Sequence, residues 1–289
     1  MARPRLVVVK VGSSTLVDAA GALDRDYIRS LCDQVARLVS LGTRVVIVSS
    51  GAAAAGRETL GFSDRPEDLA TLQACASAGQ ARLTQAYADV LAERGIPCGQ
   101  VLLTRRDVMD RDGFLNARTT LSRLIELGAV PVVNENDTVS TAEFAFGDND
   151  MLGALVSAMV GADLYLICSD VDGLYTANPQ EDPTATLIEH VDEVGPELTA
   201  LAGGAGTSFG TGGMSSKLRA ARAMLAVGVP MIICRGRRPD ALLDAVAGER
   251  VGTRFEAPAG APHEAGRKLW IGLAEVPRGS ISLDAGATR

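Results

Sequence analysis

Residues 6–14 read LVVVKVGSS, and their pattern recurs along the chain. The β-branched run from Leu6 to Val11 is typical of a buried strand. The glycine and serines that follow lie at its carboxyl end, where open α/β sheets bind ligands. Lys10 interrupts the run, and burying a lysine is unfavourable unless its ammonium is paired or contacts an anion. Two alternatives stay open for Lys10: it faces a ligand from a buried strand, or it lies on an edge strand with its ammonium in water.

A helix and a second strand follow this first unit. Asp24 opens a helix whose apolar residues recur on one face, and Gly42 ends it. Val45–Val48 then forms a strand that leads into Ser50, Gly51 and an alanine-rich helical stretch. Further helices are expected at 69–94, 116–127 and 151–160, and further strands at 101–103, 130–133, 164–168 and 231–234. Because strands and helices alternate, we predict a mainly parallel sheet with helices on both faces.

Polar residues gather after the fourth strand and before the helix at 151–160. Residues 134–137 read NEND, and residues 147–150 read GDND. An aspartate at a helix start is usually only an N-cap, but this run of polar residues exceeds what one cap needs. We therefore favour a functional role for residues 147–150 over simple capping, and residues 134–137 form a polar cluster at the carboxyl end of another strand. Residues 141–146 are expected to form a small hairpin arm, and residues 174–179 an exposed loop.

A second informative stretch, residues 203–228, reads GGAGTSFGTGGMSSKLRAARAMLAVG. Its glycines let the backbone approach a ligand closely. From Met214 the apolar residues recur on one helix face, and Gly228 with Pro230 ends the helix. Lys217 lies in the first turn, where the positive end of the helix dipole disfavours a lysine unless an anion is near. Together these features favour a phosphate-binding site, with a flexible surface loop before an ordinary helix as the alternative.

This glycine-rich stretch matches neither of two common phosphate-binding motifs. A P-loop requires Ser or Thr after its lysine, but Leu218 follows Lys217. The dinucleotide fingerprint requires a third glycine where this chain has Ser215, although Gly210 and Gly212 fit its first two positions. A phosphate site here would therefore belong to another fold.

Composition limits the classes of function. The chain has 289 residues, 47% of them hydrophobic, and a net charge of −7. It contains no basic block, which argues against a nucleic-acid surface. Its cysteines are scattered and never form C-x-x-C, so we expect buried thiols in a reducing compartment. His190 and His263 have no partners at metal-ligand spacing and are expected to be incidental.

The chain shows no sign of a targeting or membrane segment. The opening MARPRLVVVK is too short for a signal peptide, because a strand pattern follows at once. No apolar run approaches the roughly 18 residues of a membrane span. We therefore expect a cytoplasmic protein that has no membrane partner.

Six stretches of the chain resemble the glutamate 5-kinases of the amino acid kinase family. They are VVKVGSSTL (8–16), VSSGAAAAG (48–56), VPVVNENDTV (130–139), FGDNDMLGALV (146–156), CSDVDGLYTANP (168–179) and GTGGMSSKLRAA (210–221). They run in the family's order, and the last three are specific to it. The resemblance implies an open, mainly parallel eight-stranded sheet in a three-layer α/β/α sandwich. It further implies a kinase domain at 1–258, a linker at 259–272, and the first strand of a truncated PUA-like domain at 273–289.

The resemblance also implies roles for individual residues. Lys10 and Lys217 would contact the ATP phosphates and the transferring phosphoryl group, and Asp150 would hold both lysines in place. The residues that would bind glutamate are Ser50, Gly51, Asn134, Asp137 and Asn149. The residues that would line the ATP site are Gly12, Ser169, Asp170, Thr211, Gly212, Gly213, Met214, Ser215 and Ser216, with the two lysines.

The implied reaction transfers the γ-phosphoryl group of ATP to the γ-carboxylate of L-glutamate, giving γ-glutamyl phosphate and ADP in the first step of proline biosynthesis. A carboxylate with a pKa of about 4.3 is already ionised at neutral pH and needs no general base. Catalysis then rests on positioning and charge stabilisation. The two lysines, Mg²⁺ and the backbone N–H groups of Gly12, Gly51 and Gly212 would supply these. Phosphates and waters would hold Mg²⁺, so no protein ligand is assigned. The resemblance also implies a homo-oligomer and feedback inhibition by proline.

Two other functions are kept as alternatives. An N-acetylglutamate kinase-like enzyme would use the same chemistry, but Asp137 argues against it, because an acylated substrate has no ammonium to pair with a buried carboxylate. A non-catalytic sensor of amino acids or nucleotides could lose Lys10, Lys217 or Asp150, and this chain has all three. Trapping an acyl phosphate with hydroxylamine would separate these alternatives.

Overall fold

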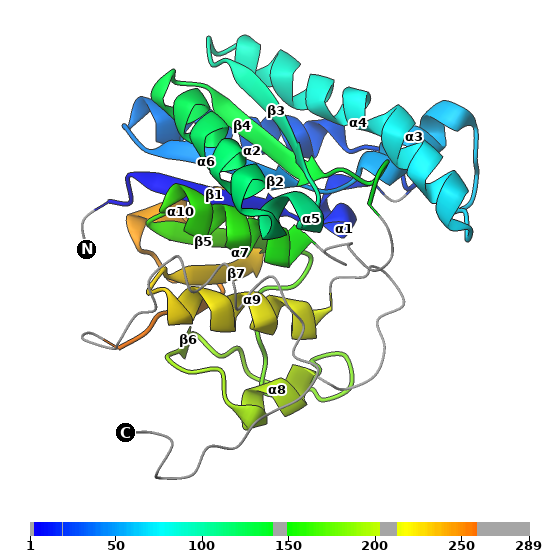
Figure 1. Ribbon diagram of the computed structural model, residues 1–289. Helices are drawn as coiled ribbons and strands as arrows, with labels where there is room; N and C mark the ends of the chain where they lie inside the picture. Colours follow the sequence, from blue (N-terminus) through cyan, green and yellow to red (C-terminus); the bar gives the residue numbers. More distant parts are fainter. Residues whose placement is uncertain (1–2, 19, 141–148, 203–212, 259–289) are drawn as a thin grey trace, which may run out of the picture.

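The computed structural model shows a sheet with helices on both faces (Figure 1). It describes residues 3–18, 20–140, 149–202 and 213–258. Within them the sheet has eight strands in the order β3-β4-β2-β1-β5-β7-β8-β6. The strands are β1 (Leu6–Val11), β2 (Arg44–Ser49), β3 (Cys98–Leu103), β4 (Val130–Glu135), β5 (Leu164–Ser169), β6 (His190–Val191), β7 (Met231–Arg235) and β8 (Thr253–Phe255). Neighbouring strands are parallel except β7 and β8, which confirms the predicted mainly parallel sheet.

The helices form two layers that cover the two faces of the sheet. They are α1 (Ser13–Leu16), α2 (Arg25–Ser40), α3 (Ala52–Leu60), α4 (Leu69–Ala92), α5 (Arg105–Met109), α6 (Arg111–Glu126), α7 (Asn149–Val160), α8 (Pro196–Ala202), α9 (Met214–Ala226) and α10 (Ala241–Ala247). One apolar core joins α2, α4 and α10 to the sheet, and the other joins α6, α7 and α9 to its opposite face. The three-layer sandwich is therefore confirmed.

Strand β1 lies in the middle of the sheet, between β2 and β5. Its Lys10 pairs in register with Val48 on one side and Ile167 on the other, and only 4% of its surface is exposed. The edge-strand alternative for Lys10 is therefore wrong. Successive side chains on a strand point to opposite faces, and Val8 belongs to the core beneath α7 and α9. Lys10 consequently points to that same face.

Most expected elements are present, with shifts at their ends. Helix α6 begins five residues before the expected 116, because Asp110 caps it by accepting from the N–H of Gly113. Helix α7 begins at Asn149, so Asn149 and Asp150 lie inside its first turn and do not precede it. The loop expected to be exposed at 174–179 starts with buried Leu174, whose N–H donates to Thr253 Oγ1.

Strands β6 and β8 and helices α1, α5, α8 and α10 were not predicted from the sequence. Strands β6 and β8 are very short, and the apolar residues of α10 span only two turns, so neither gives a clear periodic pattern. The expected arm at 141–146, the loop at 203–212 and the segments at 259–272 and 273–289 lie outside the described residues. In the part of the chain that is described, no helix is long and apolar enough to cross a membrane.

Candidate active site

Three charged side chains meet at the carboxyl end of the sheet. The ammonium of Lys10 lies 2.5 Å from Asp150 Oδ1, and the ammonium of Lys217 donates to Asp150 Oδ2 over 3.1 Å. Lys10 comes from β1, Asp150 from the first turn of α7 and Lys217 from the first turn of α9. The structure thus joins side chains from three separate segments of the chain into one lysine–aspartate–lysine triad.

Local structure explains why Asp150 can stand between the lysines. An acidic residue is favourable in the first turn of a helix, because the N–H groups there are unpaired and the helix dipole is positive. Tyr165, on β5, fixes this turn of α7 by donating from its hydroxyl to the carbonyl of Asp150 over 2.8 Å. Its ring lies where a side chain on Gly153 would clash, so α7 can approach β5 closely.

The triad is buried and electrostatically unbalanced. The side chain of Asp150 is fully buried, and those of Lys10 and Lys217 are nearly so. Burial alone would raise the pKa of Asp150, but the charges and hydrogen bonds of Lys10 and Lys217 outweigh it and hold that pKa below its usual value. With Asp150 ionised and both lysines charged, the triad carries a net charge of +1. Such a group attracts an anion.

A cluster of amides and hydroxyls adjoins the triad. Asn149 Nδ2 lies within hydrogen-bond distance of Ser49 O (2.7 Å), Ser50 Oγ (2.9 Å) and Asn134 Oδ1 (2.8 Å). Next to Ser50, Gly51 has a φ of +92° and starts α3, a left-handed conformation that glycine adopts without strain. The expected substrate residues Ser50, Gly51, Asn134 and Asn149 are therefore neighbours in space.

Two carboxylates follow on β4 and the turn after it. The pKa of Asp137 is raised from 3.8 to about 6, mainly by burial and to a smaller extent by the charge of Glu135. Glu135 is buried and accepts from Ser140 Oγ over 2.7 Å, which fixes its position. A raised pKa in a carboxylate marks a site that would gain from a cationic partner.

The residues expected to line an ATP site lie at the ends of β1 and β5 and the start of α9. Gly12 donates its N–H to Cys168 O over 3.3 Å, so this backbone donor is engaged in the sheet and is not free for a phosphate as the sequence suggested. Ser169 is buried at the end of β5, and its hydroxyl donates to exposed Asp170.

On α9, Gly213 is the N-cap residue and, as a glycine, has no side chain to make a capping hydrogen bond. Ser216 and Lys217 are buried, Met214 is half-buried and Ser215 is exposed. Thr211 and Gly212 lie outside the described residues, so their placement stays a prediction.

Sequence reasoning missed several polar residues that surround this site. Gln80 and Tyr87 of α4 contact Asn134 and Ser49 through buried hydrogen bonds. Gln80 sits at a buried position of its helix, and a glutamine on an apolar helix face could have been noticed. In the described part of the chain no group of His, Cys, Asp and Glu has the arrangement of a metal site. All five cysteines are free thiols; four are buried as expected, and Cys98 is half-buried.

Comparison with known proteins shows which family the chain belongs to. Residues 5–235 match the model of the amino acid kinase family. The chain belongs to this family. Its curated relatives include the glutamate 5-kinase of Geobacter sp. (strain M21), 50% identical over 281 residues, which are 97% of this chain and 75% of that protein. Another is the glutamate 5-kinase of Burkholderia thailandensis, 46% identical over 287 residues, which are 99% of this chain and 77% of that protein.

A solved structure of the same architecture supports the fold alone. The crystal structure of UMP kinase from Bacillus anthracis superposes with a TM-score of 0.62 at 15% sequence identity. The match covers 89% of this chain and 98% of that one. At such low identity the likeness says nothing about the substrate, but it agrees with the predicted amino acid kinase fold.

Proposed function

We propose that this protein transfers the γ-phosphoryl group of ATP to the γ-carboxylate of L-glutamate, giving γ-glutamyl phosphate and ADP in the first step of proline biosynthesis. The observation that carries the proposal is the buried triad, in which two lysines share one carboxylate beside a cluster of amides and hydroxyls. The relatives named glutamate 5-kinase match nearly the whole chain, and their name indicates glutamate as the substrate.

Lys10, Lys217 and Asp150 form the catalytic group in this proposal. The two ammonium groups neutralise the charge that separates a carboxylate nucleophile from a polyphosphate and stabilise the transferring phosphoryl group. Asp150 orients both lysines and, because it carries one charge against two, leaves a net positive site. The ionised substrate carboxylate attacks directly, so no general base is required.

Glutamate is held at the cluster beside the triad. Asp137 pairs with the substrate ammonium, which lowers the free energy of a carboxylate that is otherwise unfavourably half-buried. Ser50, Gly51, Asn134 and Asn149 complete the proposed glutamate site. An acetylated substrate has no ammonium for Asp137, which is why glutamate is favoured over N-acetylglutamate.

ATP lies against the ends of β1 and β5 and the start of α9. A Cβ at position 12 would lie 3.6 Å from Lys10 Nζ. Because Gly12 has no side chain, the space beside this ammonium stays open. The other residues assigned to this side are Ser169, Asp170, Thr211, Gly212, Gly213, Met214, Ser215 and Ser216. The described residues offer no carboxylate cluster for a resident metal. Mg²⁺ would enter with the nucleotide, held largely by phosphates and waters, and would shield the phosphate charge.

The wider proposal concerns assembly, regulation and location. By its resemblance to the family, the protein forms a homo-oligomer in the cytoplasm and is inhibited by proline. Residues 1–258 form the kinase domain, 259–272 a linker and 273–289 the first strand of a PUA-like domain. Size-exclusion chromatography with light scattering and a proline titration of the activity test the first two statements.

A hydroxylamine trap tests the reaction itself. The protein is incubated with ATP, Mg²⁺, hydroxylamine and either L-glutamate or N-acetylglutamate, and the coloured ferric hydroxamate is measured. We expect hydroxamate with L-glutamate and little with N-acetylglutamate. The opposite preference would assign the protein to acetylglutamate, and no hydroxamate with either would favour the sensor function.

A further inference from the structure

We propose that Gln80, on helix α4, is a positioning residue that orients the amides of the glutamate pocket without touching the substrate. It acts on Asn134 and, through Asn134, on Asn149. The inference rests on the proposed function, because it assigns Gln80 a role in the affinity for glutamate. Neither the sequence motifs nor the charged triad point to this residue.

The three amides form a chain in which every donor points the same way. Asn149 Nδ2 donates to Asn134 Oδ1 over 2.8 Å, and Asn134 Nδ2 donates to Gln80 Oε1 over 2.8 Å. Gln80 Nε2 then donates to Thr84 Oγ1, one helical turn further along α4, over 3.1 Å. The chain thus runs from the edge of the substrate pocket to a helix that packs on the sheet.

Because the three amides are buried, reversing any of their hydrogen bonds would be energetically unfavourable. Asn149, Asn134 and Gln80 each expose less than a tenth of their surface, at 8%, 3% and 8%. A buried amide that loses its partner is far less favourable than an exposed one, because water cannot replace the bond. If Asn134 were flipped, its oxygen would face Gln80 Oε1 and its NH₂ group would face the NH₂ group of Asn149. The backbone N–H of Glu135 also donates to Asn134 Oδ1, over 2.9 Å, so Gln80 and Glu135 together select one of the two orientations of Asn134.

The orientation of Asn134 in turn fixes what Asn149 offers to a ligand. Ser49 O, Ser50 Oγ and Asn134 Oδ1 compete for the two hydrogens on Asn149 Nδ2. The NH₂ group is thus occupied by the protein, and the carbonyl oxygen of Asn149 is the atom that can accept from a substrate. A disordered or flipped Asn149 would present hydrogens to the substrate ammonium and weaken its binding.

Helix α4 is suited to hold this chain still. Gly79 precedes Gln80 and lies so close to α3 that a Cβ there would be 1.9 Å from Ala52 O. Two more side chains from α4 reach the same region: Tyr87 bonds Ser49 Oγ at 3.1 Å, and Gln73 donates to Ser140 O over 2.7 Å. Gln80 is thus one of several polar contacts that tie α4 to the strand ends around the pocket.

Steady-state kinetics of Gln80→Met test the proposal, with Gln85→Met as the matched control. Gln85 lies on the same helix and bonds Asp89 four residues on, but it is exposed and outside the chain of amides. Gln80→Met removes the acceptor for Asn134 while keeping an unbranched side chain of similar length. We expect the KM for glutamate to rise about tenfold in Gln80→Met, with the KM for ATP and the thermal midpoint little changed. Gln85→Met should match the wild type in all three.

Two further variants separate positioning from packing. Gln80→Glu keeps an oxygen facing Asn134 and should hold the KM for glutamate closer to the wild-type value than Gln80→Met does. Thr84→Val removes only the last acceptor of the chain and should raise the same KM by about threefold. Because Thr84 is half-buried and valine has nearly its shape, this variant gives a result even if Gln80→Met does not fold.

The outcomes distinguish this inference from the proposed function. An unchanged KM for glutamate in Gln80→Met and Thr84→Val, with an active wild type, would overturn the role of Gln80 alone. Equal rises in the KM for glutamate and ATP, or a fall in thermal midpoint that accounts for the lost activity, would show that Gln80 only supports packing. A wild-type protein that consumes no ATP in the presence of glutamate would instead refute the proposed function.

Discussion

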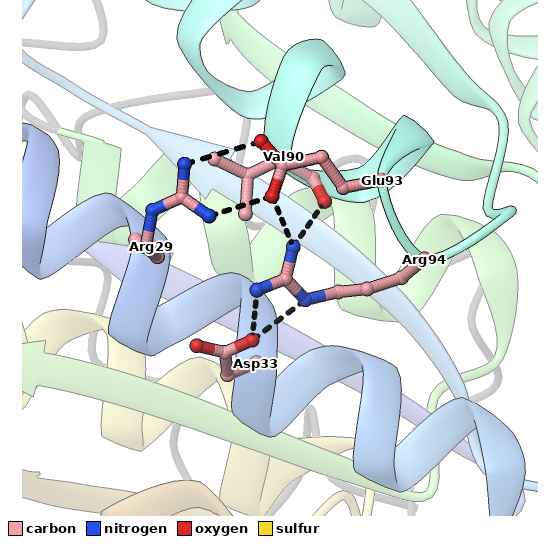
Figure 2. Close-up of polar contacts among 5 residues, drawn as sticks. All are labelled: Arg29, Asp33, Val90, Glu93 and Arg94. Carbon is pink, nitrogen blue, oxygen red and sulfur yellow. Dashed lines mark hydrogen bonds and ion pairs between the residues drawn. The ribbon is translucent and has the colours of Figure 1, made fainter.

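Two charge clusters in this molecule have similar contacts but different surroundings. In the buried triad, Lys10 and Lys217 share Asp150. On the surface, Arg29 of α2 forms a two-bond pair with Glu93 at the end of α4, and Arg94 bonds both Glu93 and Asp33 (Figure 2). Arg29 and Glu93 each expose half of their side chain, whereas Asp150 exposes none.

The difference in burial and in net charge indicates what each cluster contributes to stability or to ligand binding. The surface network holds two cations and two carboxylates, so it is neutral, and water screens each pair to a value of about 0–1 kcal/mol. The buried triad holds two cations for one carboxylate in a site where charge is expensive to place. Such a cluster does not stabilise the fold efficiently, but it is prepared for an anion. The surface network therefore helps to hold α2 against α4, whereas the triad is the group to which we have proposed a catalytic role.

The largest expected effect comes from removing either buried lysine. Lys10→Met and Lys217→Met each delete the ammonium and keep an unbranched stem, so the protein should stay folded. We expect kcat to fall on the order of 10²–10³-fold in each, because a preorganised donor to developing charge is lost. The rate of phosphoryl transfer is measured as the release of ADP, and circular dichroism checks that each variant is folded. An unchanged kcat would remove that lysine from the transfer step.

A double-mutant cycle tests whether Asp150 acts through Lys217. Asp150→Asn should lower kcat in its own right, because both lysines lose the group that orients them. Once Lys217 is replaced by methionine, orienting it has no value, so the combined loss in Lys217→Met with Asp150→Asn should be smaller than the sum of the separate losses. Losses that add fully would show that Asp150 does something other than orient Lys217.

Asp137 offers a pH test of the substrate pocket. Burial and the charge of Glu135 raise its pKa to about 6, and only the ionised form pairs with an ammonium. We expect kcat/KM for glutamate to fall up to about tenfold per pH unit below pH 6, while the γ-carboxylate, with a pKa of about 4.3, stays ionised. Asp137→Asn should abolish this inflexion, and Glu135→Gln should move it to lower pH. A profile that is flat from pH 7 to 5 in the wild type would contradict the assignment.

The same shift has a consequence for the stability of the ligand-free protein. The folded state binds the Asp137 proton more tightly than the unfolded state does, because its pKa is about 6 against 3.8. The stabilisation is therefore fully present below pH 3.8 and is lost as the pH rises through about 6. Asp137→Asn should remove this loss, and urea unfolding at pH 4 and pH 7 measures it. A wild-type and Asp137→Asn pair with the same pH dependence would count against the shift.

The smallest effect is expected on the surface. Arg94→Met removes the contacts to Glu93 and Asp33 but leaves the active site untouched. We expect a loss of about 1 kcal/mol or less in the free energy of unfolding and no change in kcat. Urea unfolding with and without 0.5 M NaCl is the measurement, since salt should reduce the small difference further. A loss of several kcal/mol would mean that the network is a structural element comparable to the buried one.

Much of the fold could be predicted from the sequence because its signals are local. The valine-rich run of β1 and the apolar face of α2 each lie within one element, so periodicity reveals them. Strands β6 and β8 could not be predicted, because their few residues pair with each other and with β7 only in the folded sheet. The motifs also placed Lys10 and Lys217 in one site, but only by resemblance to known kinases.

The sequence by itself determined the alternation of strands and helices, and with it a parallel sheet whose carboxyl edge carries the polar residues. The resemblance implied that Asp150 holds Lys10 and Lys217, and the structure shows both contacts. Only the tertiary structure decided that Lys10 is central and buried and that Gln80 meets Asn134. The physical reason is the separation along the chain of the residues that interact. Secondary structure follows from the spacing of neighbours in the chain, whereas a hydrogen-bond partner or a pKa depends on which distant segments pack together and exclude water.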